Sequence, residues 1–378
     1  MKLLINKFFA FVFMYLIMQV SISHAASFNF DLNNASKLNA IIETQVKDTY
    51  GFNGLAIYLN QVQYYVVDEE QIQTLNRTQN SAINLTNDQW LAITGRFNVL
   101  LIQSKDAEIN FDSDQKIVIS STQMNPLTRI VDKSQLNDIA PELNQIRYNH
   151  LWKPFAVLSR LFESLLILIK DTTTLSWGFC VILFAIIIKL VLWPVSILTA
   201  KTQQNVSKIN SQLQPKLAEI KSKYKGEKAH HYAMKAHKEL GVSPFFTLKP
   251  MLSFFIQIPI LIALFNTLGE MPQLINQPFL WFNDLSQPDM LIPLGFSIPF
   301  LGSYLNLMPL TMTFVTLSAT LLHKDKHASN ADLKKQRLKL YLMSASFLIL
   351  FYPFPAAMVM YWTVTNLISL IQQKIAQR

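Results

Sequence analysis

The residue best placed to do chemistry is Lys189, which lies inside an apolar run from Trp177 to Ser196. As a helix this run of about 20 residues spans the hydrocarbon core of a bilayer. A charge at the centre of a membrane helix costs about 2.5 to 3.5 kcal/mol, so an ionisable residue there indicates function. The alternative is snorkelling, because Lys189 lies seven residues from the end of the run and its stem shortens the distance to water.

Several other apolar stretches carry polar side chains that a simple anchor would not need. Buried in lipid, each requires a partner, so these side chains are expected to face one another or a wet cavity. Interhelical hydrogen bonding accounts for most of the Ser and Thr residues, but no Asp or Glu lies inside any stretch to pair with Lys189. The sequence therefore predicts a hydrated groove, open toward the cytosol. Besides Lys189, its candidate residues are Ser253, Gln257, Thr316, Ser346, Thr365 and Asn366.

No catalytic or metal-binding constellation appears in the sequence. With Cys180 as the one cysteine, neither an intrachain disulfide nor a cysteine metal cluster can form. The adjacent histidines His230 and His231 do not share a helical face, and the apolar stretches contain no nucleophile and base pair. We therefore expect no catalytic residue, no metal and no cofactor.

Composition and charge favour a protein with several membrane spans. Hydrophobic residues make up 51% of the chain and charged residues 15%, which is too few charges for a soluble chain of this length. Residues 26–150 have a net charge of −5, whereas residues 151–378 have a net charge of +12. We interpret this asymmetry as membrane topology and predict no nucleic-acid specificity.

The chain begins like an exported protein. A basic start is followed by an apolar run from Phe8 to Val20 and by small residues at Ser23 and Ala25. This pattern predicts a secretory signal peptide over residues 1–25, with an uncleaved anchor as the alternative. In either case residues 26–150 are expected outside the cytosol, in the periplasm.

Residues 26–150 are predicted to form a small α+β domain with its own core. Apolar spacing predicts a helix over Asn33–Tyr50, and the Asp68-Glu69-Glu70 cluster reads as surface charge. Runs rich in Val, Ile, Tyr and Phe predict strands, the last two forming a hairpin. These strands are Gly54–Val67, Trp90–Gln103, Ala107–Asp112 and Lys116–Ser120.

The remainder is predicted to be an α-helical polytopic membrane protein with five spans. Residues 151–170 predict an amphipathic helix in the outer interface. Lysine and arginine alternate between the following loops as nine, none, six, none and two, which places the exported domain outside and the C-terminus in the cytosol. The predicted elements within residues 171–378 are spans at about 177–196, 247–268, 303–322, 340–352 and 356–371, with a basic helical hairpin at 201–241.

The order of several motifs resembles the YidC/Oxa/Alb family of membrane protein insertases over about residues 150–378. The motifs are Trp193-Pro194, Leu213-Gln214-Pro215-Lys216, Ile256-Gln257-Ile258-Pro259-Ile260, Trp281-Phe282-Asn283-Asp284-Leu285, Phe354-Pro355, Tyr361-Trp362 and Thr365-Asn366-Leu367. The resemblance implies a five-helix insertase core, a hydrophilic groove and a cytosolic helical hairpin. It also implies that Lys189 occupies the position of the family's groove arginine, with Gln257, Tyr361 and Trp362 lining the groove or its exit toward lipid. The hairpin lysines it singles out are Lys216, Lys221, Lys223 and Lys225.

The resemblance implies a non-enzymatic insertase and chaperone in the bacterial inner membrane. It would move polar tails and hydrophobic segments of nascent membrane proteins out of the cytosol, with membrane lipids, the Sec translocon and the ribosome as further candidate partners. The chain departs from the family in two ways: Lys189 replaces arginine, and the exported domain is small, as in a divergent member. The alternative function is a secondary transporter using Lys189 and Gln257, although the sequence lacks the internal repeats that many transporters have.

Overall fold

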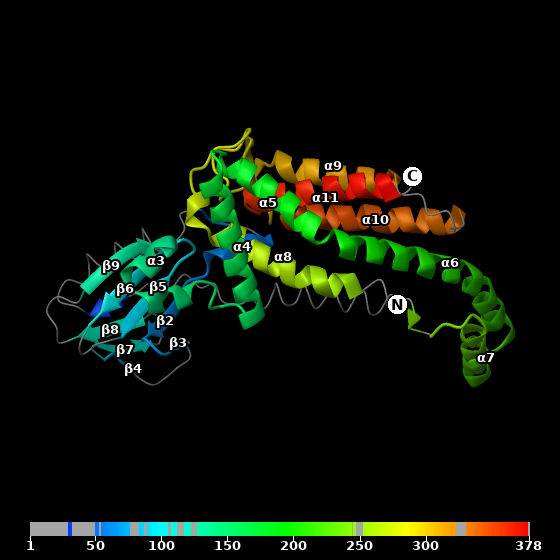
Figure 1. Ribbon diagram of the computed structural model, residues 1–378, viewed down its shortest axis with the longest axis horizontal. Helices are drawn as coiled ribbons and strands as arrows, with labels where there is room; N and C mark the ends of the chain where they lie inside the picture. The colour runs from blue at the N-terminus through cyan, green and yellow to red at the C-terminus, as the bar shows by residue number, and fades with distance from the viewer. Residues whose placement is uncertain are drawn as a thin grey trace.

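The computed structural model describes residues 29–31, 50–52, 54–75, 83–86, 89–104, 107–111, 117–121, 127–243, 245–246, 252–322 and 330–376. A β-rich domain precedes a helical bundle, and the two lie end to end in Figure 1. The predicted signal peptide and most of the predicted helix Asn33–Tyr50 lie outside the described residues.

Two sheets form the β-rich domain. The larger is antiparallel, with strand order β3-β2-β5-β6-β9, and the smaller has the order β1-β8-β7-β4, in which β1 and β8 are parallel. The strands of the larger sheet are β2 (Gln63–Val67), β3 (Ile72–Thr74), β5 (Trp90–Thr94), β6 (Asn98–Gln103) and β9 (Leu127–Asp132). Those of the smaller are β1 (Asn29–Asp31), β4 (Ile83–Asn84), β7 (Ala107–Phe111) and β8 (Ile117–Ser121).

The larger sheet is buried on both faces, because successive side chains of a strand point to opposite sides. Tyr64 and Val66 of β2 join a core shared with the smaller sheet. Tyr65 and Val67 join a second core, which is closed by α3 (Leu136–Ile139) and by the 3-10 helix η3 (Pro141–Ile146). Burial of both faces explains why β2, β5 and β6 read as almost continuous apolar runs.

Two of the predicted strands differ from the structure. Gly54–Val67 begins with the 3-10 helix η1 (Gly54–Asn60), because Ala56 and Leu59 pack into the core of the helical bundle. Trp90–Gln103 is two strands, joined by a turn in which the Gly95 amide donates to the Asn98 carbonyl over 2.8 Å. The predicted pairing of the strands beginning near Ala107 and Lys116 is confirmed, since β7 and β8 pair antiparallel. Strands β1, β3, β4 and β9 were not predicted.

The helical part contains eight long helices among the described residues. Within it α11 packs on α5, α8 and α9, while α4 packs on α8 and α5, and α10 on α9. Helices α6 and α7 form a hairpin that extends away from the other helices (Figure 1). The helices are α4 (Lys153–Thr172), α5 (Trp177–Val191), α6 (Trp193–Lys223), α7 (Gly226–Glu239), α8 (Leu252–Glu270), α9 (Leu307–Leu322), α10 (Asn330–Phe351) and α11 (Ala356–Ala376).

Several helix bounds differ from the predicted spans. The run 177–196 breaks at Leu192, and α6 leaves at 53° to α5. Pro194 has no backbone N–H to donate to the preceding turn, which explains a break at this point. The span predicted from Ser303 begins only at Leu307, because β10 (Ile292–Ile298) and β11 (Gly302–Leu305) form a hairpin before it. Helices α10 and α11 are longer than their predicted spans.

Within the described residues, each helix taken singly is too short or too polar to meet the criteria of length and hydropathy for crossing a membrane. The bent pair α5 and α6 meets them when taken together. Large apolar side chains nevertheless point outward from most helices of the bundle. Examples are Leu168 of α4, Phe179 of α5, Phe314 of α9, Leu342 of α10 and Leu367 of α11.

Candidate functional site

Lys189 lies in the last turn of α5, directly before the bend at Leu192. Its side chain is half-buried, and its neighbour Ile188 is buried in the bundle core. In the part of the chain that the structure describes, Lys189 makes neither an ion pair nor a hydrogen bond to a side chain. That Lys189 is a groove cation without a neutralising carboxylate therefore stays a prediction.

Tyr361 and Trp362 are consecutive on α11 but contact different helices. Tyr361 is buried, with its ring 6.0 Å from that of Phe184 on α5. Trp362 lies in an aromatic cluster, 5.3 Å from Phe351 of α10 and 6.5 Å from Phe265 of α8. Only Tyr361 therefore faces the helix that carries Lys189, as expected for side chains about 100° apart around a helix.

The structure brings two of the predicted polar residues together. The Asn366 Nδ2 of α11 donates to the Thr316 Oγ1 of α9 over 2.9 Å, and that hydroxyl donates to its own helix at Met312. The hydroxyl of Thr365 donates to the Trp362 carbonyl within α11. The bond between Asn366 and Thr316 supports the interpretation that these two residues hydrogen-bond between helices.

Gln257 and Ser346, which were also predicted to line the groove, do not take part in that hydrogen bond. Gln257 on α8 is exposed. Ser346 is exposed on α10 and its hydroxyl donates to the Leu342 carbonyl in the same helix. The side chain of Ser253 lies outside the described residues.

The predicted hairpin lysines are exposed on α6 or directly after it. Lys216 lies 3.5 Å from Glu239 of α7, and Lys223 lies 2.6 Å from Glu219 one turn earlier in α6. Lys221 and Lys225 make no ion pair among the described side chains. Exposed pairs of this kind contribute little to stability, so the hairpin presents mainly positive charge to solvent.

At its other end α5 is held against the loop that follows α8. A Cβ atom at Gly178 would overlap the ring of Phe279, so the ring rests directly on the helix backbone. Phe279 exchanges two backbone hydrogen bonds with Phe282 and also contacts the ring of Phe179 at 5.0 Å. A residue larger than glycine at position 178 would displace this loop.

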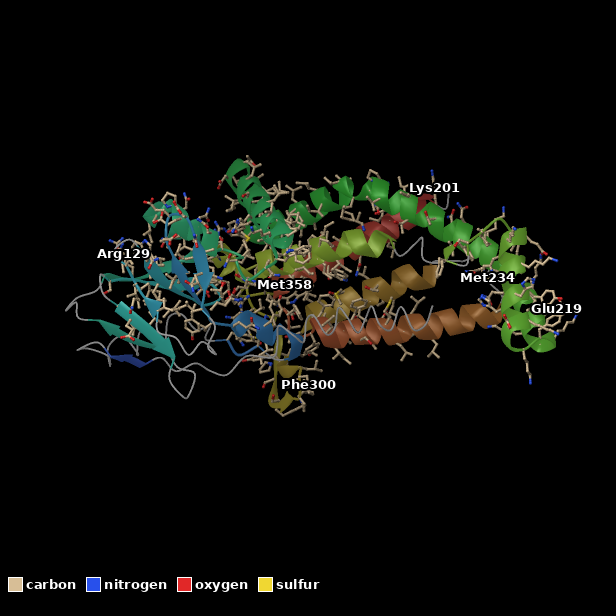
Figure 2. The ribbon with its side chains drawn as sticks, turned by 90° about the horizontal axis from the view of Figure 1, so that it is seen from below. Arg129, Lys201, Glu219, Met234, Phe300 and Met358 are labelled. Atoms are coloured by element: carbon tan, nitrogen blue, oxygen red, sulfur yellow. The ribbon has the colours of Figure 1, made fainter. Side chains whose placement is uncertain are left out.

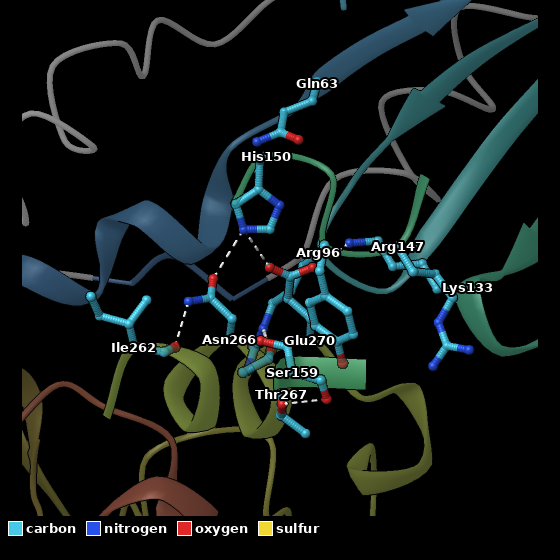
Figure 3. Close-up of polar contacts among 12 residues, drawn as sticks. Gln63, Arg96, Lys133, Arg147, His150, Ser159, Ile262, Asn266, Thr267 and Glu270 are labelled. Atoms are coloured by element: carbon cyan, nitrogen blue, oxygen red, sulfur yellow. Dashed lines mark hydrogen bonds and ion pairs between the residues drawn. The ribbon is translucent and has the colours of Figure 1, made fainter. Parts of the chain in front are cut away.

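The densest polar cluster was not predicted from the sequence and lies between the β-rich domain and the bundle (Figure 3). Arg96, in the turn between β5 and β6, is buried and donates to the carbonyls of Gly269 at 2.6 Å and Ser286 at 2.7 Å. Its guanidinium also lies over the rings of Phe52 and Phe97. One side chain thus joins the sheet to the end of α8 and to the loop beyond it.

Glu270, the last residue of α8, is the carboxylate of this junction. Its oxygens lie 2.7 Å from Lys133 Nζ and 3.2 Å from His150 Nε2, and that nitrogen is also 3.0 Å from the Asn266 amide oxygen. Burial raises the pKa of Glu270, but the positive charges of Lys133, His150 and Arg96 outweigh it and hold the pKa below its usual value. Glu270 therefore remains ionised and paired at neutral pH.

A second buried carboxylate, Glu163, ties the same junction to α4. It forms an ion pair with Arg147 and accepts a 2.8 Å hydrogen bond from the Tyr148 hydroxyl. Burial, reinforced by the adjacent carboxylate, raises the pKa of Tyr148 well above its usual value. Helix α4 also packs on α8 and buries Ser159 and Glu163, and its position in the membrane interface stays a prediction.

The junction was missed because its members are far apart in sequence. Arg96 and Gly269 are separated by 173 residues, and no local pattern links them. One signal was available: Glu163 is an acid in the middle of α4, among Phe162, Leu165 and Leu166. A carboxylate there requires a buried partner or an exposed face.

Comparisons with known proteins agree on one family. The family model described as "60Kd inner membrane protein" matches residues 168–378. The chain is 36% identical over 203 residues to the membrane protein insertase YidC of Syntrophobacter fumaroxidans, covering 53% of this chain and 34% of that protein. For the YidC of Chlorobium luteolum the identity is 31% over 258 residues, covering 67% and 41%.

A solved structure and the lengths of the relatives complete the comparison. A crystal structure of an active YidC insertase, with its first transmembrane domain resolved, aligns with a TM-score of 0.40 at 19% identity, over 82% of this chain and 73% of that one. The chain spans between about a third and two fifths of the length of the two curated relatives named above. Since the family model covers more than half of the chain, this protein belongs to the 60Kd inner membrane protein family.

Proposed function

We propose that this protein is an inner-membrane insertase that moves polar tails and apolar segments of nascent membrane proteins from the cytosol into the bilayer. The observation that carries the proposal is Lys189, half-buried and without a carboxylate partner among the described residues, in a bundle that exposes large apolar side chains. Family membership and the YidC relatives support the same function. The transporter alternative has no support from these relatives.

The proposed topology has five spans, built on α5, α8, α9, α10 and α11. The β-rich domain would lie in the periplasm, with the α6–α7 hairpin and the C-terminus in the cytosol. The charge asymmetry of the loops supports this orientation. Outward side chains such as Phe179, Phe314 and Leu342 would then contact lipid acyl chains.

The proposed mechanism needs no covalent chemistry. The basic hairpin would attract the client, and Lys189 would attract acidic residues of its leading tail into the groove. The apolar segment would then leave past Tyr361 into lipid, driven by about −0.3 to −0.6 kcal/mol for each Leu, Ile, Phe or Val. The membrane potential adds about 2.3 kcal/mol per charge for each 100 mV and pulls an acidic tail outward.

The test is insertion of a single-span client with an acidic exported tail into liposomes that contain only this protein, scored by protection of the tail from external protease. One charge pair at 4 Å in water contributes about 1 kcal/mol, so Lys189→Ala should slow insertion roughly fivefold. Lys189→Arg should restore the rate. Lys153→Ala, which removes an exposed lysine at the start of α4, is the matched control.

A second client with a neutral tail separates the effect of the tail's charge from general damage to the insertase. Lys189→Ala should leave its insertion almost unchanged. Equal losses for both clients would rule out the electrostatic role of Lys189, and no protection by the wild-type protein would rule out autonomous insertion. Adding the Sec translocon or ribosomes to the same assay would then identify the missing partner.

A further inference from the structure

An uncharged β-hairpin, made of β10 and β11, projects sideways from the bundle near its junction with the β-rich domain (Figure 2). Large apolar side chains along it are exposed to between 38% and 74%. A soluble surface rarely exposes so many apolar residues together without a binding function. The exposed residues are Leu291, Ile292, Phe296, Phe300 and Tyr304.

The chemistry of the hairpin limits what can cover it. From Met290 to Leu322 the chain contains no Asp, Glu, Lys, Arg or His. A partner that recognises charge therefore has nothing to bind. Along β10 the exposed positions include neighbouring residues that point to opposite faces. A folded partner would cover one face, whereas a fluid apolar phase covers both.

Hydrogen bonds fix the base of the hairpin to the bundle. The carboxylate oxygen Oδ2 of Asp289 accepts from the backbone amides of Leu307 and Met308 at the start of α9, over 2.7 and 2.8 Å. The Asn306 amide group donates to the Tyr352 carbonyl at the end of α10 over 2.8 Å. The hairpin is thus held at the first turn of α9, the end that the proposed topology places at the outer membrane surface.

The polar backbone groups of the hairpin limit how deep it can lie in the membrane. A two-stranded hairpin leaves the outer edges of both strands without a strand partner, and such groups cannot be buried in hydrocarbon. The backbone must therefore remain among the polar headgroups while the side chains reach the acyl chains. The Phe300 carbonyl and the ring of Pro353 both lie close to Gly54, which braces the tip at the same end of the bundle.

We propose that the hairpin Leu291–Leu305 is an interfacial anchor that inserts Phe296 and Phe300 into the outer leaflet of the membrane. This proposal rests on the topology given under the proposed function. The anchor would hold the outer end of α9 at a constant depth in the bilayer.

The test uses the full chain with Cys180→Ala, reconstituted in phosphatidylcholine and phosphatidylglycerol vesicles. Single cysteines replace Phe296 or Phe300 and carry a nitroxide spin label. Collision with oxygen, which partitions into lipid, is compared with collision with a water-soluble nickel chelate by electron paramagnetic resonance. Leu342→Cys on the outward face of α10 is the lipid control, and Asn137→Cys, at an exposed position of α3, is the water control.

We expect the labels at 296 and 300 to favour oxygen severalfold over the chelate relative to position 137, and to lie shallower than position 342. If they match position 137 while position 342 remains in lipid, the hairpin lies in water and the proposal is wrong. That outcome would favour a protein partner and leave the insertase function intact. If position 342 also behaves like position 137, the proposed topology fails and the anchor fails with it.

Discussion

The junction between the β-rich domain and the bundle differs sharply from the polar positions inside the bundle. At the junction, Arg96, Lys133 and Glu270 are nearly buried and matched with partners at 2.6 to 2.7 Å. Lys189 is half-buried, and the described residues offer it no carboxylate. Buried charges that are paired specify how two parts fit together, whereas an unpaired charge keeps its field available to a ligand. The contrast separates charges that hold two parts of the molecule together from a charge that no described carboxylate neutralises.

The largest expected effect is at the junction. Arg96→Ala removes two buried hydrogen bonds and leaves the carbonyls of Gly269 and Ser286 without that donor. We expect the free energy of unfolding to fall by about 2 to 4 kcal/mol, measured by denaturant titration of the full chain in detergent. Arg129→Ala is the control, since Arg129 is exposed on β9 and its loss should cost at most about 0.5 kcal/mol. Equal losses would show that Arg96 does not join the two parts.

A smaller effect should appear with pH. The folded-state pKa of Glu270 is lower than its ordinary value of 4.5, so the unfolded chain binds the proton more tightly. The stability contributed by Glu270 is therefore present above pH 4.5 and is lost as the pH falls through the folded-state value. Thermal unfolding of wild type and Glu270→Gln should converge as the pH is lowered from 6 toward 3. Parallel curves would contradict the pairing with Lys133.

Within the bundle, the bond between Thr316 and Asn366 should contribute less. Thr316→Val keeps the shape of the side chain but removes the acceptor for Asn366 Nδ2. Interhelical hydrogen bonds in membrane proteins average about 0.6 kcal/mol, and we expect a loss of that size in detergent unfolding. Thr313→Val is the matched control, because the Thr313 hydroxyl donates within α9 to the Pro309 carbonyl. A control loss as large as the Thr316 loss would assign the effect to the helix itself.

The smallest expected effect on stability is at Lys189. Because no described carboxylate is left unpaired by its removal, Lys189→Ala should leave the free energy of unfolding unchanged or raise it by up to about 1 kcal/mol. The same variant should slow insertion of acidic clients roughly fivefold. A drop in stability of 2 kcal/mol or more would show that Lys189 is paired, and would remove the contrast with the junction.

The sequence predicts those parts of the molecule that depend on local pattern. The apolar runs predicted α5, α8 and α11 approximately, and runs rich in Val, Ile and Phe predicted β7 and β8. The break at Leu192 was missed because hydropathy continues unchanged past Val191, and only Pro194 signals it. The helical turn η1 was missed because Ala56 and Leu59 fold to suit a core formed by residues far along the chain.

The polar residues of the two sites also divide into those that the sequence predicts and those that only the structure reveals. Lys189 was found from sequence because a charge in an apolar run is visible without any structure. Arg96, Lys133 and His150 look like ordinary surface residues of a soluble domain, and only the fold brings them to Glu270. The lack of Lys and Arg in the segment after α8 was used to predict which side of the membrane it occupies. The structure adds that Asp289 accepts hydrogen bonds from the first backbone amides of α9 and that Glu270 forms an ion pair with Lys133 at the junction.

The ring of Phe279 resting on Gly178 has a mechanical consequence for α5. The helix is fixed near Trp177, where no side chain intervenes between ring and backbone, and the chain bends at Leu192, directly after its other end. Lys189 lies three residues before Leu192, so a force transmitted through the α6–α7 hairpin reaches this charge before it reaches the Gly178 contact.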